Sequence, residues 1–97
     1  MKIMISQPMK GKTDEEIRAE REGLVKELES NGYEVIDTIF AEEPPENADR
    51  AMWYLAKSIE AMSYVDGVVF MQGWENNRGC VAEEYIARKY NKFCKYL

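Results

Sequence analysis

The chain contains no histidine, and it has only two cysteines and three prolines among its 97 residues. The lack of histidine excludes every mechanism that relies on an imidazole base. Cys80 and Cys94 do not form a Cys-x-x-Cys pair, so neither a zinc site nor a structural disulfide is predicted. Acid or base chemistry must therefore fall to Asp, Glu, Tyr, Lys or Cys, and we expect no metal and no cofactor.

Long apolar runs are also missing, since no stretch approaches the roughly 18 residues that a membrane span requires. The first residues, MKIMISQPMKG, lack the cleavage pattern of a secretory signal. We therefore expect a soluble cytoplasmic protein with no membrane partner. The net charge is −5, and acidic side chains cluster in residues 13–22 and 41–49. Such clusters repel a phosphate backbone, so polymeric nucleic acid is not expected as a partner.

Hydrophobic periodicity and turn residues divide the chain into alternating strands and helices. Thr13 and Glu16 form a capping-box pattern at a helix start, and Asn31 with Gly32 is typical of a helix stop. Strands are predicted at residues 2–6, 33–37, 67–72 and 92–97, with helices between them at about 13–31, 48–62 and 79–90. This alternation predicts one α/β domain over residues 1–97, a flavodoxin- or Rossmann-like three-layer fold with a parallel sheet in strand order 2-1-3-4.

In a sheet of that order, ligands bind beyond the carboxyl ends of the strands where the order reverses. The rule selects two loops, SQPMKGK at residues 6–12 and GWENNRG at residues 73–79. Asp66 precedes the third strand, so it belongs at the opposite end of the sheet, where it is a candidate polar stop after the second helix. We expect a small-molecule site between the two loops.

The first of these loops partly matches a phosphate-binding loop. SQPMKGKT, residues 6–13, has Ser6 where the motif GxxxxGK[ST] has its first glycine. Pro8 removes one backbone N–H that such a cradle needs, which disfavours a nucleoside triphosphatase. Two interpretations remain open: a simpler contact to phosphate or ribose, with Lys10 and Lys12 attracting the phosphate, and a plain structural turn.

Two adjacent carboxylates, Glu83 and Glu84, follow the second loop. Their neighbours at helical spacing differ, so we expect the two residues to have different roles. Glu84 lies four residues before Arg88, so a salt bridge on a solvated face explains it. Glu83 has Gly79 and Cys80 one turn earlier and has no cation at helical spacing. An acid near a helix N-terminus on a face of small residues leaves room for a ligand. Glu83 is therefore either a functional carboxylate or an acid that merely complements the helix dipole.

Three stretches together resemble the small nucleoside 2-deoxyribosyltransferase-like family, over about the whole chain: IMISQPMKG, SIEAMSYVDGVVF and GWENNRGCVAEEYIA. In characterised relatives a Glu in the helix after the third strand attacks C1′ of a deoxyribosyl group. Gly stands four residues before that Glu, and Ala four residues after it. Gly79, Glu83 and Ala87 fall on this spacing, so the resemblance implies that Glu83 is the nucleophile.

The chain also departs from that family. The helix Asp that helps relatives hold or protonate the substrate corresponds to Ser58, and an aromatic residue of the first strand corresponds to Met4. Asn77 stands where some relatives have Ser, and its amide can donate to a phosphate or hydroxyl. Asp37, at the carboxyl end of the second strand, is the best candidate for a leaving-group acid.

The predicted ligand is a nucleoside or nucleotide, cleaved or transferred at its N-glycosidic bond by Glu83. The predicted substrate-binding residues lie on both loops and on the second helix, with Trp74 as a wall for the base: Ser6, Gln7, Ser58, Gly73, Trp74, Asn77 and Gly79. One alternative is a non-catalytic module that binds or sequesters a nucleotide or a nucleotide-derived signal. Another is an interaction domain whose acidic loop, residues 38–49, docks a partner.

The second helix also predicts self-association. Its apolar stripe of Met52, Leu55, Ile59 and Met62 is expected to face the sheet. Trp53 and Tyr54 beside that stripe add more apolar surface than one sheet-facing side can hide. We therefore expect a homodimer or larger assembly with Trp53 or Tyr54 at the contact.

Overall fold

Four short parallel strands form one sheet in the order β2-β1-β3-β4, as predicted. The structure, a computed structural model, describes all residues from 1 to 97. The elements in chain order are β1 (Lys2–Ser6), α1 (Asp14–Ser30), β2 (Glu34–Ile36), α2 (Arg50–Met62), β3 (Gly67–Phe70), the 3-10 turn η1 (Trp74–Asn76), α3 (Arg78–Lys89) and β4 (Phe93–Tyr96). None of the helices is long and apolar enough to span a bilayer.

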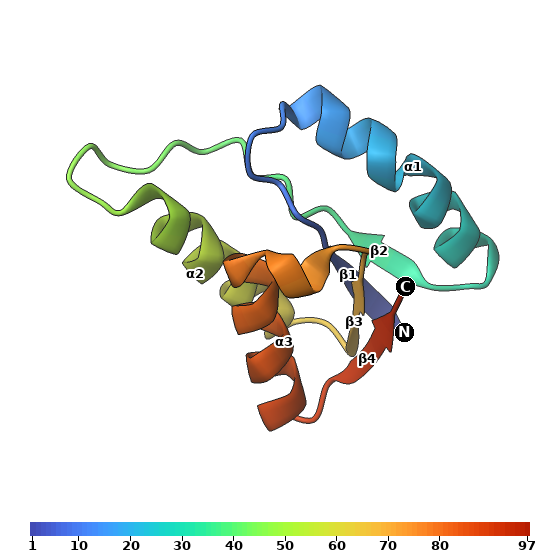
Figure 1. Cartoon of the computed structure of the whole chain (residues 1–97). Coiled ribbons are helices and arrows are strands. Elements are labelled where there is room, and N and C mark those ends of the chain that lie inside the picture. The colour runs from blue at the N-terminus through green and yellow to red at the C-terminus, as the bar shows by residue number, and fades with distance from the viewer.

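The sheet lies between α1 on one face and α2 with α3 on the other (Figure 1). Alternate residues of each strand point to opposite faces, so the chain has two small cores. On the α1 face Ile3, Ile5 and Val69 pack with Leu28. On the other face the core joins residues of β1, α2, the turn after α2, β3 and α3: Met4, Met62, Val65, Val68, Phe70 and Ala87. This arrangement confirms the three-layer α/β fold.

Side-chain caps fix where the helices begin. The capping box of α1 forms as predicted, with Glu16 N donating to Thr13 Oγ1 at 3.2 Å and Thr13 N donating to Glu16 Oε1 at 3.0 Å. Asp49 caps α2 by accepting from Met52 N at 3.0 Å, so this helix begins two residues later than the predicted Ala48. Asn77 caps α3 in the same way and therefore sets the direction in which that helix leaves the second loop.

Asp66 lies at the amino end of the sheet, as predicted. Its carboxylate accepts from Lys2 N at 2.7 Å, and its own N–H donates to the Lys2 carbonyl at 2.8 Å. This contact ties the start of β1 to the start of β3, far from the predicted site. Asp66 therefore does more than end the second helix.

The apolar stripe of α2 only partly faces the sheet. Met62 is buried, whereas Met52 is 67% exposed, so the prediction for Met52 was wrong. The first turn of α2 projects beyond the sheet (Figure 1), and its side chains meet a cavity instead of the core.

The aromatic pair of α2 is partly covered within the chain. The rings of Trp53 and Tyr54 meet edge to face at 5.2 Å. Lys57 lies over the Trp53 ring, and Arg50 lies over the Tyr54 ring. These contacts reduce the exposed aromatic surface on which the expectation of self-association through α2 was based.

Gly67 makes the closest backbone approach in the sheet, and it leads to a stability prediction. A Cβ at this position would lie 2.9 Å from the Phe93 carbonyl oxygen and 3.1 Å from Ile3 Cδ1, so β3 and β4 would have to separate. Gly67→Ala is therefore expected to destabilise the fold by about 1–3 kcal/mol in urea denaturation. Gly23→Ala in α1, where a Cβ meets nothing within 4 Å, should stabilise it by about 0.5–1 kcal/mol. A change of the same sign in both variants would contradict this account of the sheet.

Candidate functional site

A cavity of about 1040 Å³ opens between the two loops at the carboxyl end of the sheet, where the strand order reverses. Its lining includes residues 6–12 apart from Pro8 and Gly11, and residues 76–80 from the second loop and the start of α3. Other lining residues come from β1, the start of α1, α3, the loop before α2 and α2 itself, among them Phe40 and Tyr54. The prediction placed Ser58 of α2 in the site but did not include the loop before α2, because nothing in the spacing shows where a long loop folds back.

Glu83 lies on the inner wall of this cavity and touches the end of β1. Ser6 Oγ donates to Glu83 Oε1 at 3.0 Å, although the two residues are 77 positions apart. Ser6 is 1% exposed and Glu83 is 8% exposed. The strand end thus holds the carboxylate in one position, and this contact brings together two of the predicted site residues, Ser6 and Glu83.

Burial raises the pKa of Glu83 from 4.5 to about 7. The Ser6 hydroxyl, the nearby charge of Arg21 and the Ser58 hydroxyl act in the opposite direction, because each favours the ionised form. At neutral pH the protonated and ionised forms therefore coexist. A carboxyl group poised in this range can act as a nucleophile, as a base or as an acid.

A buried arginine on α1 stands on the other side of β1 and was missed from the sequence. Arg21 is 5% exposed; its Nε donates to Gln7 Oε1 at 2.8 Å, and its Nη1 donates to Thr38 Oγ1 at 3.3 Å. Its Nη2 is buried without a hydrogen-bond partner. The sequence did contain a signal for the burial of Arg21, because this residue lies at helical spacing between Ile17 and Leu28, which are buried on the apolar face of α1.

Gln7 is held by the protein on both ends of its amide. Besides accepting from Arg21, it donates through Nε2 to the Ile17 carbonyl at 3.1 Å and to Glu20 at 3.3 Å. Gln7 lines the cavity, but these contacts occupy the groups with which it would hold a ligand. Its arrangement fits support of the wall better than direct contact with a sugar or phosphate.

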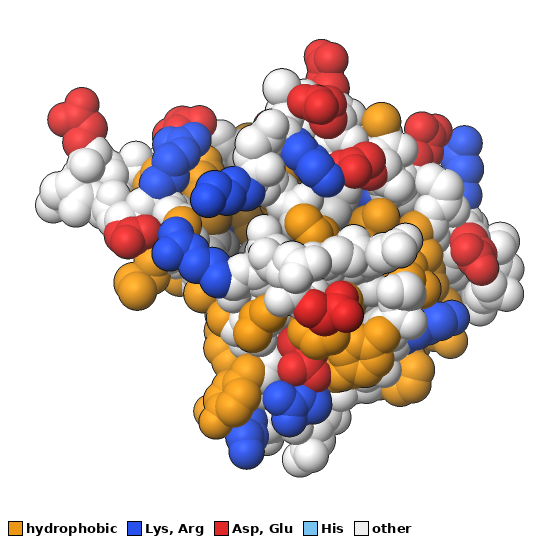
Figure 2. All heavy atoms as spheres, in the orientation of Figure 1, with side chains coloured by type: hydrophobic (Ala, Val, Ile, Leu, Met, Phe, Trp, Pro, Cys, Tyr) orange, Lys and Arg blue, Asp and Glu red, His pale blue; other side chains and the backbone are white.

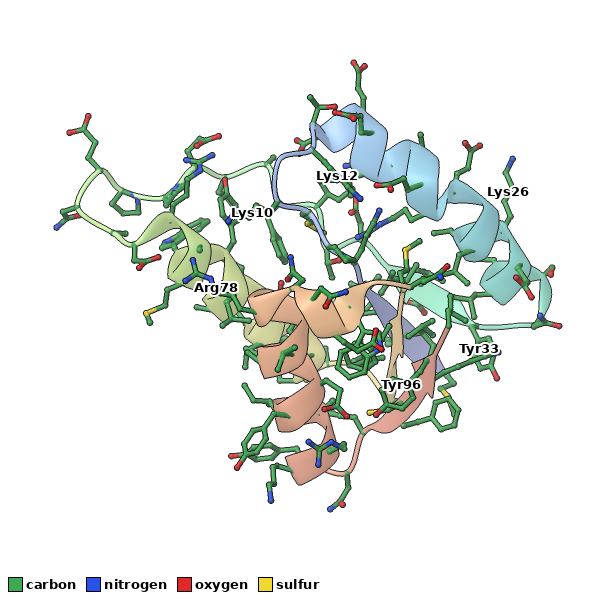
Figure 3. All side chains as sticks on the ribbon, viewed as in Figure 1. Lys10, Lys12, Lys26, Tyr33, Arg78 and Tyr96 are labelled. Carbon is green, nitrogen blue, oxygen red and sulfur yellow. The ribbon has the colours of Figure 1, made fainter.

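Basic side chains surround the opening of the cavity. Figures 2 and 3 show Lys and Arg side chains gathered around the loop after β1 and the starts of α2 and α3. Lys12 is paired with Glu20 at 2.9 Å, and Arg50 is paired with Glu43 at 2.9 Å. Lys10 and Arg78 also line the cavity and make no ion pair, so they are the cations free to meet an anionic ligand.

Six of the predicted site residues line the cavity: Ser6, Gln7, Ser58, Asn77, Gly79 and Glu83. Trp74 and Gly73 lie outside its lining. The indole of Trp74 packs instead on Phe70 and Tyr96, each at a ring-centroid distance of 5.4 Å. Gly73 has φ +93°, and this left-handed turn, followed by η1, directs Trp74 back onto the core.

Glu84 and Asp37 need correction as well. The predicted ion pair of Glu84 with Arg88 is confirmed, with 2.6 Å between Glu84 Oε2 and Arg88 Nε. The prediction that Glu84 lies on a solvated face was wrong, because Glu84 is 8% exposed and also accepts a hydrogen bond from the Tyr96 hydroxyl at 2.6 Å. Asp37 is exposed, pairs with Arg18 at 3.2 Å and does not line the cavity.

Comparison with known proteins gives a family match over nearly the whole chain. The family model described as "Domain of unknown function (DUF4406)" matches residues 1–96. No curated protein and no solved structure matches the chain significantly. The assignment of chemistry therefore depends on the geometry of the cavity.

The raised pKa of Glu83 predicts how stability depends on pH. The folded state holds the Glu83 proton more tightly than the unfolded chain, so this group stabilises the fold below about pH 4.5, and its contribution is lost as the pH rises to about 7. Glu83→Gln cannot ionise. The variant should match the parent near pH 4 and exceed it by about 3 kcal/mol near pH 8. Urea denaturation of both proteins across this range tests it, and a pH-independent difference would contradict the burial of an ionisable Glu83.

Proposed function

The chain belongs to the family described as "Domain of unknown function (DUF4406)", and for this member we propose a domain that binds a nucleoside or nucleotide and cleaves or transfers at its N-glycosidic bond. The observation that carries the proposal is the buried Glu83 carboxyl, held by Ser6 against the wall of a cavity large enough for such a ligand. The resemblance to nucleoside 2-deoxyribosyltransferase-like proteins supports the same chemistry.

In the proposed reaction an oxygen of ionised Glu83 forms a bond to the anomeric carbon while the bond from that carbon to the base nitrogen breaks. The electron pair of the broken bond leaves with the base, which takes up a proton. Water, or the nitrogen of another base, then attacks the anomeric carbon and releases the Glu83 carboxylate. The attacking group loses its proton to solvent, so the cycle returns Glu83 to its starting state.

Three neighbours favour the ionised form of Glu83 that this reaction requires. The Ser6 hydroxyl donates to its carboxylate, and Ser58 and the Arg21 charge also lower its pKa against the effect of burial. Asn77 caps α3 through its side-chain oxygen, which leaves its amide N–H groups available to a ligand hydroxyl or phosphate. No metal or cofactor is part of the proposal.

A phosphorylated ligand fits the charge of the opening. Lys10, on the loop after β1, and Arg78, at the start of α3, line the cavity without ion-pair partners (Figure 3). We therefore favour a nucleoside monophosphate over the unphosphorylated nucleoside.

The cysteines fit a cytoplasmic protein. Cys80 and Cys94 are free thiols, and disulfides are rare in the reducing cytoplasm.

One observation favours the alternative of a non-catalytic nucleotide-binding module. Retaining glycosidases use a second carboxyl group about 5–5.5 Å from the nucleophile. Of the three other acids that line the cavity, Asp49 caps α2 and Glu43 pairs with Arg50. Asp14 is exposed in the first turn of α1, and Asp37 is outside the lining. None of these carboxyl groups shares a hydrogen bond with Glu83, so no partner acid is held beside it to protonate the departing base.

Cleavage assays distinguish the two functions. Glu83→Gln keeps the size of the side chain and removes the nucleophile, so release of free base from deoxynucleoside monophosphates should fall at least about a hundredfold. Glu84→Gln is the matched control, because Glu84 contacts Arg88 and Tyr96 and does not line the cavity. The binding module predicts no cleavage by the parent and an altered ligand affinity in the Glu83 variant. Parental activity and affinity in both variants would refute the site.

The role of the phosphate is tested by comparing a nucleoside with its monophosphate in thermal-shift or calorimetric titrations. The monophosphate should bind more tightly at low salt, and its advantage should shrink as salt screens the cations. Lys10→Gln should reduce that advantage about two- to fivefold, as expected for an exposed charge worth up to ~1 kcal/mol. Lys26→Gln is the control, because Lys26 lies on α1 away from the cavity and pairs with Glu22 (Figure 3). Equal affinities of the two ligands at low salt would contradict phosphate recognition.

A further inference from the structure

The two faces of the sheet are covered unequally. Both α2 and α3 pack on one face, while α1 is the one helix on the other, where its Leu24 and Leu28 lie over β1 and the near side of β3 (Figure 1). The outer strand β4 has no helix above it on the α1 face. Phe93 and Leu97, which alternate with the inward-facing Cys94 and Tyr96, are 51% and 50% exposed.

This open half of the face forms a groove between α1 and β4 with a volume of about 320 Å³. Five of its eight lining residues are hydrophobic, and they come from α1, the residue before β2, β3 and the end of the chain: Leu24, Leu28, Tyr33, Val69 and Leu97. Glu27, Asn31 and Lys95 supply the polar part of the lining. The cavity that holds Glu83 opens at the carboxyl ends of the strands, and none of the groove's residues lines that cavity.

The charges at the groove differ from wall to wall. Glu27 lies on the α1 wall and Lys95 lies on the β4 wall, and neither has an ion-pair partner within the chain. The same asymmetry extends beyond the pair. Helix α1 has seven acidic and three basic side chains, whereas the only charged side chain of β4 is the basic Lys95. An acidic helix and a strand with a single positive charge therefore flank the groove.

We propose that a second copy of this chain covers the groove, with the α1 helix of each protomer lying over the β4 strand of the other. A two-fold axis through the groove brings the same surface of both copies together, so each contact occurs twice. Glu27 of one protomer would face Lys95 of its partner, and Lys95 would face the partner's Glu27. The exposed Phe93 and Leu97 become buried, and opposite charges meet at both ends of the contact.

The total exposed surface agrees with a missing partner. The chain exposes 6436 Å², whereas a folded monomer of 11.3 kDa typically exposes about 5,700 Å². A stable interface buries ~800 Å² of each partner. The loop that projects between β2 and α2 and the uncovered half of the sheet both add exposed surface (Figure 1). The uncovered half of the sheet has the exposed Phe93 and Leu97 near Glu27 and Lys95, which lack ion-pair partners.

Charge reversal tests this interface independently of any ligand or activity. Light scattering and sedimentation at tens of micromolar should show a dimer for the parent. Glu27→Lys and Lys95→Glu each place like charges together twice, so each variant alone should weaken the dimer at least tenfold. Mixing the two variants should restore a dimer. In the heterodimer the two substituted side chains have opposite charges and face each other, and the native Glu27 of one protomer faces the native Lys95 of the other.

Glu60→Lys and Lys89→Glu make the same changes of charge on α2 and α3, at exposed positions on the other face of the sheet, and should leave the dimer intact. Circular dichroism checks that every variant is folded. A monomeric parent, or a mixture of Glu27→Lys and Lys95→Glu that stays monomeric, would overturn the proposal. Dissociation by the α2 and α3 variants instead would assign the interface to the face that includes Trp53 and Tyr54.

Discussion

The site depends on the contacts by which the end of β1 holds two buried groups of opposite charge, Glu83 and Arg21. Ser6 and Gln7 are consecutive, so their side chains point to opposite faces of the sheet. Ser6 holds Glu83 of α3 on one face, and Gln7 holds Arg21 of α1 on the other. Burying either charge alone would be costly, and each lowers the cost of the other across the strand. The position of both helices at the cavity follows from this pair of contacts.

Much of this architecture could be predicted from the sequence. Local signals were sufficient for the capping box at Thr13, for the buried strand at Val68 and Val69, and for the strand order, because each depends on neighbouring residues or on the handedness of crossovers. The topology also predicted that the loops after β1 and β3 lie at the same end of the sheet, whereas the contact of Ser6 with Glu83 was found only in the structure. The helical spacing also showed that Glu83 has no basic residue one turn away on α3.

The remaining features depend on contacts between distant segments, which spacing does not reveal. Tyr96 reaches Glu84 only because β4 returns beside β3, so a carboxylate that looked solvated is buried. Trp74 turns onto Phe70 because Gly73 adopts a left-handed conformation. Arg21 is buried because Gln7 and Thr38 supply acceptors from two other segments. In each case a partner from elsewhere in the chain changed the role of a polar or aromatic residue.

The register of the sheet has a consequence for how the chain folds. β1 pairs with β3 through Ile3 opposite Gly67, so these neighbouring strands lie more than sixty residues apart in the chain, and β1 finds its central neighbour only after β3 has been made. Pairing of such remote segments closes a long loop before native contacts repay the lost entropy, which slows folding. Until then the apolar side chains of β1 have no sheet to join beyond the three residues of β2. The nascent chain therefore carries an unprotected apolar strand until β3 has been made.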